Sequence, residues 1–129
     1  MKLLPVAASD AELIAFVDQW TGLLQREDYE GAHAFTDHVR SGLSAEQIRE
    51  AIKGYGQARP DQRATLSGMP SDVTQHKLIY RSEPNPSGYV AEIVYDLNID
   101  EVATDLSATF EVVNVGDGLS VRLIDIHTL

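Results

Sequence analysis

The chain has 129 residues, of which 43% are hydrophobic and 23% are charged, and it contains no cysteine. This length fits one domain, 1–129, with a single core; the composition excludes a disordered chain, and the missing cysteines exclude disulfides, a thiol nucleophile and cysteine-bound zinc. The net charge of −10 repels phosphate backbones, so we expect no nucleic-acid partner.

Residues 1–9 resemble a signal peptide only faintly. Their apolar stretch spans about six residues, which is shorter than the roughly 7–15 of a working signal sequence. We therefore expect an ordinary N-terminus and a cytoplasmic protein. No apolar run approaches the roughly 20 residues needed to cross a bilayer, so no membrane partner is expected.

The first helix is predicted over residues 10–26. Ser9 and Glu12 have the spacing of a capping box, in which each side chain accepts a hydrogen bond from a backbone N–H of the opening turn. An apolar stripe then recurs at helical spacing: Leu13, Phe16, Val17, Trp20, Leu23 and Leu24. We expect this helix to end near Arg26 and Glu27.

Two shorter helices are predicted to follow. Asp28 can cap a helix from Tyr29 to about Asp37. Ser44 and Gln47 then form a second capping box. The buried face of the third helix is expected to contain Ile48, Ala51, Ile52 and Tyr55.

A stretch without clear periodicity separates the helices from the strands. Gly54 and Gly56 supply the positive φ that ends the third helix without strain. Residues 57–72 contain Pro60, Gly68 and Pro70 and show neither helical nor strand period, so we predict a loop there.

The second half predicts four consecutive strands joined by turns. From Tyr89 to Ile99 every odd position is apolar and most even positions are polar, which is typical of a strand with one buried face. Residues 105–112 repeat this pattern, and a turn at 116–118 leads into a last strand at 119–127. An earlier strand is predicted over roughly residues 73–81.

The last strand leaves one alternative open. Its apolar positions change parity, from Leu123 to Ile124 and Ile126. Either a bulge near Leu123 and Ile124 restores the register, or Asp125 and His127 point toward the core. In both cases the elements predict an α+β fold, with three N-terminal helices packed on one face of a curved, mainly antiparallel four-stranded sheet.

Four features characterise this layout: a long first helix, a short helix opening with Asp28-Tyr29-Glu30-Gly31-Ala32, a third helix opening with Leu43-Ser44-Ala45-Glu46-Gln47-Ile48, and a run of long hairpins. Together they resemble the nuclear-transport-factor-2-like superfamily, a cystatin-like α+β cone. The segments 104–111 and 124–127 look like small uncharacterised bacterial proteins of this type. The resemblance implies a pocket between the concave sheet and the helices, and many members dimerise through the sheet. The superfamily includes enzymes, ligand-binding domains and immunity proteins, so the fold does not choose among functions.

One set of residues suggests proton-transfer chemistry. Enzymes of this superfamily that abstract a proton use an Asp base in an apolar pocket, with a Tyr stabilising the oxyanion. The counterpart here is Asp125, with His127 and Tyr95 as helpers, provided that no bulge intervenes. A bulged strand would instead place Asp125 outside.

The sequence predicts neither a metal nor a cofactor. The four histidines, His33, His38, His76 and His127, form no H-x-x-x-H pair or H-E-x-x-H motif, and no glycine-rich phosphate loop is present.

Two further groups of residues are candidates for binding. Trp20, Tyr29 and Tyr55 can line a pocket mouth, although aromatic residues at helical spacing are also typical of a core. On the outer face of the sheet, an acidic stripe suited to a basic partner is predicted from Glu92, Asp96, Asp105 and Glu111. Solvent and a nearby arginine, Arg81 or Arg122, can equally dilute that charge.

Two functions follow from these patterns. The first is a non-catalytic module, for example of immunity-protein type, that binds a basic protein or a small apolar ligand and forms a homodimer through the sheet. The second is a cofactor-independent isomerase, dehydratase or cyclase that acts on a small apolar substrate, with Asp125 as the general base. The lack of a coherent catalytic set favours the first.

Overall fold

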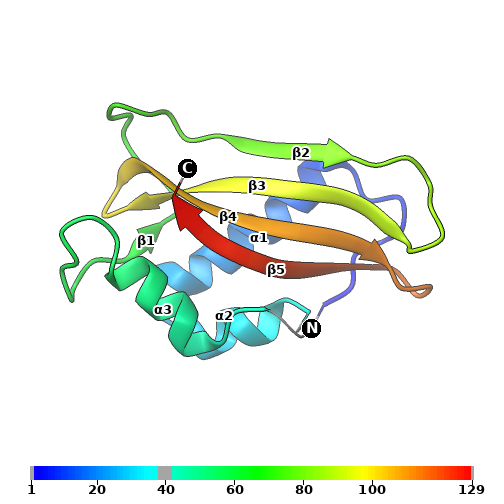
Figure 1. Ribbon diagram of the computed structural model, residues 1–129, viewed down its shortest axis with the longest axis horizontal. Coiled ribbons are helices and arrows are strands. Elements are labelled where there is room, and N and C mark those ends of the chain that lie inside the picture. Colours follow the sequence, from blue (N-terminus) through cyan, green and yellow to red (C-terminus); the bar gives the residue numbers. More distant parts are fainter. Residues whose placement is uncertain (1, 38–41, 129) are drawn as a thin grey trace.

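The computed structural model describes residues 2–37 and 42–128, so His38 lies outside the described residues (Figure 1). The helices are α1 (Asp10–Gln25), α2 (Tyr29–Phe35) and α3 (Ala45–Lys53). The strands are β1 (Ala64–Thr65), β2 (Lys77–Arg81), β3 (Tyr89–Ile99), β4 (Val102–Asn114) and β5 (Leu119–Thr128). The predicted α+β class is confirmed. No helix of the described residues is long and apolar enough to cross a bilayer.

α1 begins as its sequence predicts. The hydroxyl of Ser9 accepts a hydrogen bond from the backbone N–H of Glu12 at 3.2 Å, and the Glu12 carboxylate accepts one from the N–H of Ser9 at 3.1 Å. Two backbone donors that lack a partner within the helix are thereby satisfied. The predicted stripe lies in the core, except that Leu23 is only half-buried: the buried members are Leu13, Phe16, Val17, Trp20 and Leu24.

α2 is capped by Asp28, as predicted, but it ends earlier than expected. Its last residue is Phe35, because Thr36 adopts extended backbone with φ −101° and ψ 162°. The N–H of Asp37 then donates to the carbonyl of Val121 on β5 at 2.8 Å. The chain therefore leaves α2 to pair with the edge of the sheet.

α3 has the predicted capping box between Ser44 and Gln47. The expectation of a positive φ at Gly54 is wrong: its φ is −88°, and its N–H continues the helical pattern by donating to Glu50 at 2.8 Å. Gly56 takes the left-handed conformation instead, with φ +62°.

The sheet is antiparallel and has one strand more than predicted. Its order is β1-β3-β4-β5, and β2 also pairs with β3. β1 lies in the predicted loop, where Ala64 and Thr65 pair with the end of β3. A strand of two residues is too short to leave a period in the sequence. β2 begins at Lys77 rather than near Val73.

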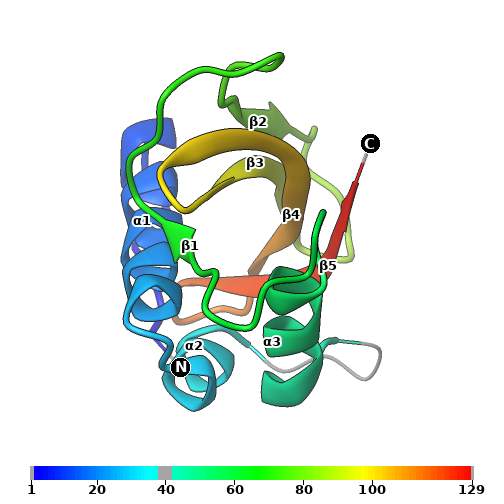
Figure 2. The ribbon, with the colours of Figure 1, turned by 90° about the vertical axis from the view of Figure 1, so that its left-hand side faces the viewer.

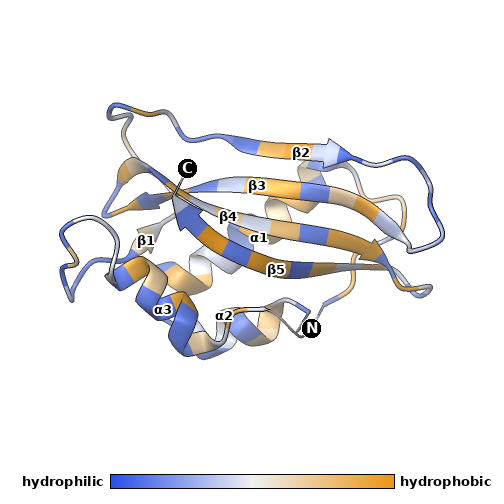
Figure 3. Cartoon of the chain, in the orientation of Figure 1, coloured by the Kyte–Doolittle hydropathy of each residue, from blue (hydrophilic) through white to orange (hydrophobic). Residues whose placement is uncertain are grey.

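The sheet is strongly curved, as Figure 2 shows. α1 lies across the opening of the curve, and α2 and α3 lie next to β5. One face, the inner face, packs against the helices. Its Tyr95 and Phe110 are fully buried, as is Trp20 of α1, and the Trp20 ring lies edge-on to Phe110 with centroids 5.0 Å apart. Figure 3 shows the apolar and polar residues alternating along β3 to β5. The predicted inward side of β3 is confirmed.

The opposite face of the sheet, the outer face, is covered over part of its length. The alternation in β3 predicts exposed side chains for Asp96 and for Asn98 on the same side of the strand, but they are 7% and 0% exposed. The segment 66–76 lies over them: the amide of Asn98 donates to the carbonyl of Leu66 at 3.3 Å, and the N–H of His76 donates to Asp96 at 3.0 Å. Gly68 permits this approach, because a Cβ there would lie 2.5 Å from Asn98.

Candidate functional site

The structure separates Tyr95 from Asp125 and His127, the other two residues of the catalytic hypothesis. Leu123 pairs with Phe110 and Asp125 pairs with Thr109, so Ile124 is the extra residue of a bulge. The bulge predicted near Leu123 and Ile124 is therefore confirmed. It keeps Ile126 on the inner face and leaves Asp125 exposed on the outer face.

Tyr95, by contrast, points from the inner face toward α1, so it cannot assist Asp125 or His127. Its hydroxyl donates to Asp18 at 2.5 Å, and the ammonium of Lys77 donates to the same oxygen at 2.9 Å. The pKa of Tyr95 is raised, first by burial and then by the bond to Asp18. The side chains of Tyr95, Lys77 and Asp18 thus link β3 and β2 to α1. The hypothesis of an Asp125 base in an apolar pocket is wrong.

His127 remains beside Asp125, with Nδ1 3.3 Å from its carboxylate. The two side chains are 40% and 54% exposed, so neither is in an apolar environment. Among the described residues, no three His, Cys, Asp or Glu side chains gather closely enough to hold a metal ion. Asp125 and His127 thus form a solvent-exposed pair on the outer face of β5.

Trp20 and Tyr29 do not line a pocket mouth. Trp20 is 0% exposed and Tyr29 is 9% exposed, and both belong to the core shared by the helices and the sheet. Burial also raises the pKa of Tyr29. Their helical spacing reflects core packing, which was the open alternative.

Tyr55 lies in a different environment, at the end of α3. Its hydroxyl donates to Asp105 at 2.5 Å, and this bond, followed by burial, raises the pKa of Tyr55. Two depressions of about 450 and 290 Å³ adjoin there, and both are lined by Tyr55 and Thr104. The Tyr55 hydroxyl and the Asp105 carboxylate already satisfy each other, so this pair primarily ties the end of α3 to β4.

The predicted acidic stripe is therefore divided. Asp105 does not lie in the stripe, because a bulge places three residues, 104–106, opposite Leu97 and turns the Asp105 side chain toward Tyr55. Asp96 is not part of an exposed stripe either, because its side chain is buried and accepts a hydrogen bond from Ser107 at 2.6 Å. Glu92 and Glu111 remain together on the open part of the outer face.

The open part of the outer face carries two rows of side chains that run across the strands. In one row Tyr80, Glu92 and Glu111 are neighbours, and in the next row Leu78, Val94, Thr109 and Asp125 are neighbours. We call these residues the outer-face patch: Leu78, Tyr80, Glu92, Val94, Thr109, Glu111 and Asp125. Sequence reasoning missed Leu78 and Tyr80, which are 41% and 55% exposed. No signal in the sequence points to them, because Leu78, Ile79 and Tyr80 are consecutive apolar residues and β2 shows no alternation that would assign them to a face.

The charge of the outer-face patch is incompletely neutralised. Glu92 and Glu111 lie directly opposite each other, and within the described part of the chain neither takes part in an ion pair. Arg122 is opposite Glu111, but its Nε donates to Asp37 at 3.0 Å. Burial together with the two glutamates raises the pKa of nearby Tyr89. Like charges in this position are destabilising, so the folded protein retains an unfavourable pair.

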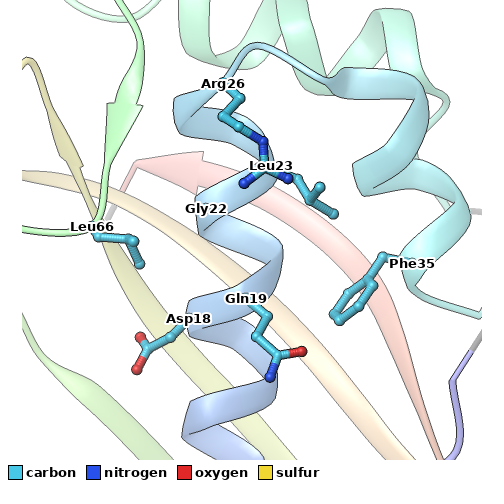
Figure 4. A pocket seen from close by; sticks show the side chains of 7 residues that line it. All are labelled: Asp18, Gln19, Gly22, Leu23, Arg26, Phe35 and Leu66. Carbon is cyan, nitrogen blue, oxygen red and sulfur yellow. The ribbon is translucent and has the colours of Figure 1, made fainter.

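A shallow trough of about 550 Å³ runs over the exposed side of α1 (Figure 4). Figure 4 shows Leu66 and Phe35 on opposite sides of the helix, with Gln19 between them. The trough is open to solvent and α1 forms its floor, so it would leave much of a small molecule uncovered. Pockets for small ligands enclose most of the ligand surface, so the trough is a weak candidate.

Comparison with known proteins gives a family without an assigned activity. The family described as Domain of unknown function (DUF7668) matches residues 21–129, and the chain belongs to this family. No curated protein and no solved structure matches the chain significantly.

Proposed function

We propose that this domain is a non-catalytic binding module that recognises a basic protein through the outer-face patch. The observation that carries the proposal is the pair Glu92 and Glu111, two carboxylates held opposite each other beside the exposed ring of Tyr80. An acidic surface next to an aromatic ring suits an arginine or lysine, which gains from both the charge and the ring face. The partner would relieve the repulsion that the free protein retains.

Catalysis has less support than binding. The proposed base, Asp125, is exposed, and the inner face that would form a pocket is filled by Trp20, Tyr95 and Phe110. The resemblance to the nuclear-transport-factor-2-like superfamily and the expected dimer through the sheet both stay predictions. A dimer through the outer face would place two copies of Glu92 and Glu111 in one interface, which argues for a basic partner instead.

The test is a double charge reversal, Glu92→Lys with Glu111→Lys. Its control is Glu50→Lys with Asp61→Lys, which changes the net charge equally but at exposed positions of α3 and the loop after it. Proteins captured by the immobilised wild type are identified by quantitative mass spectrometry, purified, and titrated against all three forms. We expect the affinity for a true partner to fall about tenfold or more per reversed charge in the patch variant, and to weaken with added salt.

The control variant should retain most of the affinity. Equal losses in both variants would mean that only the net charge matters. Retention of binding in the patch variant would remove the outer face from consideration.

A further inference from the structure

The edge of the sheet next to the outer-face patch carries free backbone groups. Among the described strands β2 pairs only with β3, and Figure 1 shows it as the outermost strand. The N–H of Asp96 donates to His76 at 2.9 Å, and that of Ser82 donates to Val90 at 2.8 Å. An antiparallel ladder alternates, so the even residues of β2 bond to β3. The N–H and C=O groups of Lys77, Ile79 and Arg81 therefore point away from the sheet.

The side chains that commonly protect such an edge are directed elsewhere. Lys77 donates to Asp18 at 2.9 Å, and Arg81 lies 2.7 Å from Asp10, both on α1. Charged side chains, lysine above all, blunt edge strands when they extend into solvent beside the backbone. Here the positive charges are neutralised against α1, so the backbone edge stays open and the charge of the nearby outer face stays acidic.

The outer-face side of this edge suits alternate cationic side chains. An added strand would lie about 4.8 Å from β2, so a side chain opposite Tyr80 would be about 10 Å from the Glu92 position, two strands away. An arginine side chain can cover the Tyr80 ring and extend toward that carboxylate. Leu78, one position along the same face, offers an apolar contact for the next such side chain.

We propose that the partner contributes an extended basic segment that adds to β2 as a further antiparallel strand. This inference rests on the proposed function and specifies how the partner binds: backbone hydrogen bonds to Lys77, Ile79 and Arg81 hold the segment, and alternate arginines or lysines over Tyr80 give specificity. A second copy of the chain is disfavoured as the occupant, because its own β2 presents Leu78 and Tyr80 on that face rather than cations.

The test uses a nine-residue peptide with arginine at alternate positions and threonine between them, titrated against the full chain. With its arginines opposite Leu78 and Tyr80, its threonines lie opposite Lys77, Ile79 and Arg81 and direct their N–H groups at β2. N-methylation of the threonines should therefore weaken binding by about tenfold or more, whereas N-methylation of the arginines, whose N–H groups point away, should have little effect. Bound peptide should also slow the hydrogen exchange of the amides of Lys77, Ile79 and Arg81.

The outcomes separate the two proposals. Binding that is lost in the Glu92→Lys and Glu111→Lys variant but is indifferent to the position of the methyl groups would overturn strand addition and leave the proposed function standing. No binding of the unmodified peptide, or equal binding by the charge-reversed variant, would overturn both. Slow exchange at Ile79 in the protein alone, with a concentration-dependent dimer, would assign the edge to a second copy and overturn the inference.

Discussion

The outer face of β3 has two halves that differ in what lies over them. Asp96 and Asn98 are covered by the segment 66–76 and have hydrogen-bond partners inside the protein. Glu92 and Val94, on the same face of the same strand, are only half-buried, and Glu92 faces another carboxylate. The difference teaches that an alternating pattern identifies the two faces of a strand, whereas the exposure of the polar face depends on a segment 20 or more residues away in sequence.

The largest difference is expected between the two faces of β4. Phe110 is 0% exposed and packs on Trp20, while its neighbour Thr109 points to the outer face. Phe110→Ala should lower the free energy of unfolding by about 3–5 kcal/mol, because a large cavity remains in the core. Thr109→Ala should change it by about 0.5 kcal/mol or less. Urea unfolding of both variants measures the contrast, and similar losses would show that the assignment of the faces is wrong.

A smaller difference is expected between the covered and open halves of the outer face. Asp96→Ala leaves the hydroxyl of Ser107 and the N–H of His76 without their partner, so it should lower the free energy of unfolding by about 1–3 kcal/mol. Glu92→Ala removes one member of a like-charge pair, and we expect no loss or a gain of a few tenths of a kcal/mol.

Thermal unfolding of the two variants side by side is sufficient for this comparison. If Glu92→Ala destabilised the protein as much as Asp96→Ala, Glu92 would have a structural role, and the open half would resemble the covered half.

The smallest effect concerns the hydroxyl that joins the inner face to α1. Tyr95→Phe removes the bond to Asp18 and should cost about 0.5–1.5 kcal/mol at neutral pH. Because the folded protein raises the pKa of Tyr95 above its usual value near 10, unfolding releases a proton in alkaline solution, and stability should fall as the pH rises above about 10. Urea unfolding at several pH values between about 8 and 11 should show a shallower decline in Tyr95→Phe.

The matched control is Tyr80→Phe on the exposed edge strand, which should leave the free energy of unfolding at neutral pH unchanged. An equally steep alkaline decline in wild type and Tyr95→Phe would contradict the assignment of that decline to Tyr95.

Local signals in the sequence predicted most of the elements correctly. The capping boxes at Ser9 and Ser44 fix the start of α1 and α3 because both partners of each box lie three residues apart. The alternation from Tyr89 to Ile99 gives β3 its bounds and its inner face. The parity change after Leu123 indicates the bulge in β5, since a strand with one buried face has a period of two.

The candidate site was only partly predictable. Glu92 and Glu111 were identified as outward-facing, but Tyr80, which lies in the same row, was missed because the sequence does not show which strand pairs with which residue of β3. Asp96 and Asp105 were assigned to the same stripe because Asp96 is an even number of residues from Glu92 along β3, and Asp105 is an even number of residues from Glu111 along β4. Parity cannot reveal a covering loop, nor a bulge that turns one side chain toward the end of α3.

By itself, the sequence determined the helices, the long strands, the inner face of the sheet and the acidic character of its outer face, because each depends on residues that are close together along the chain. Tertiary structure alone decided which carboxylates remain in solvent, that Tyr95 is bound to Asp18, and that β2 forms an open edge beside Glu92. Those features depend on groups brought together from segments 12 to 77 residues apart, and no local pattern encodes such contacts.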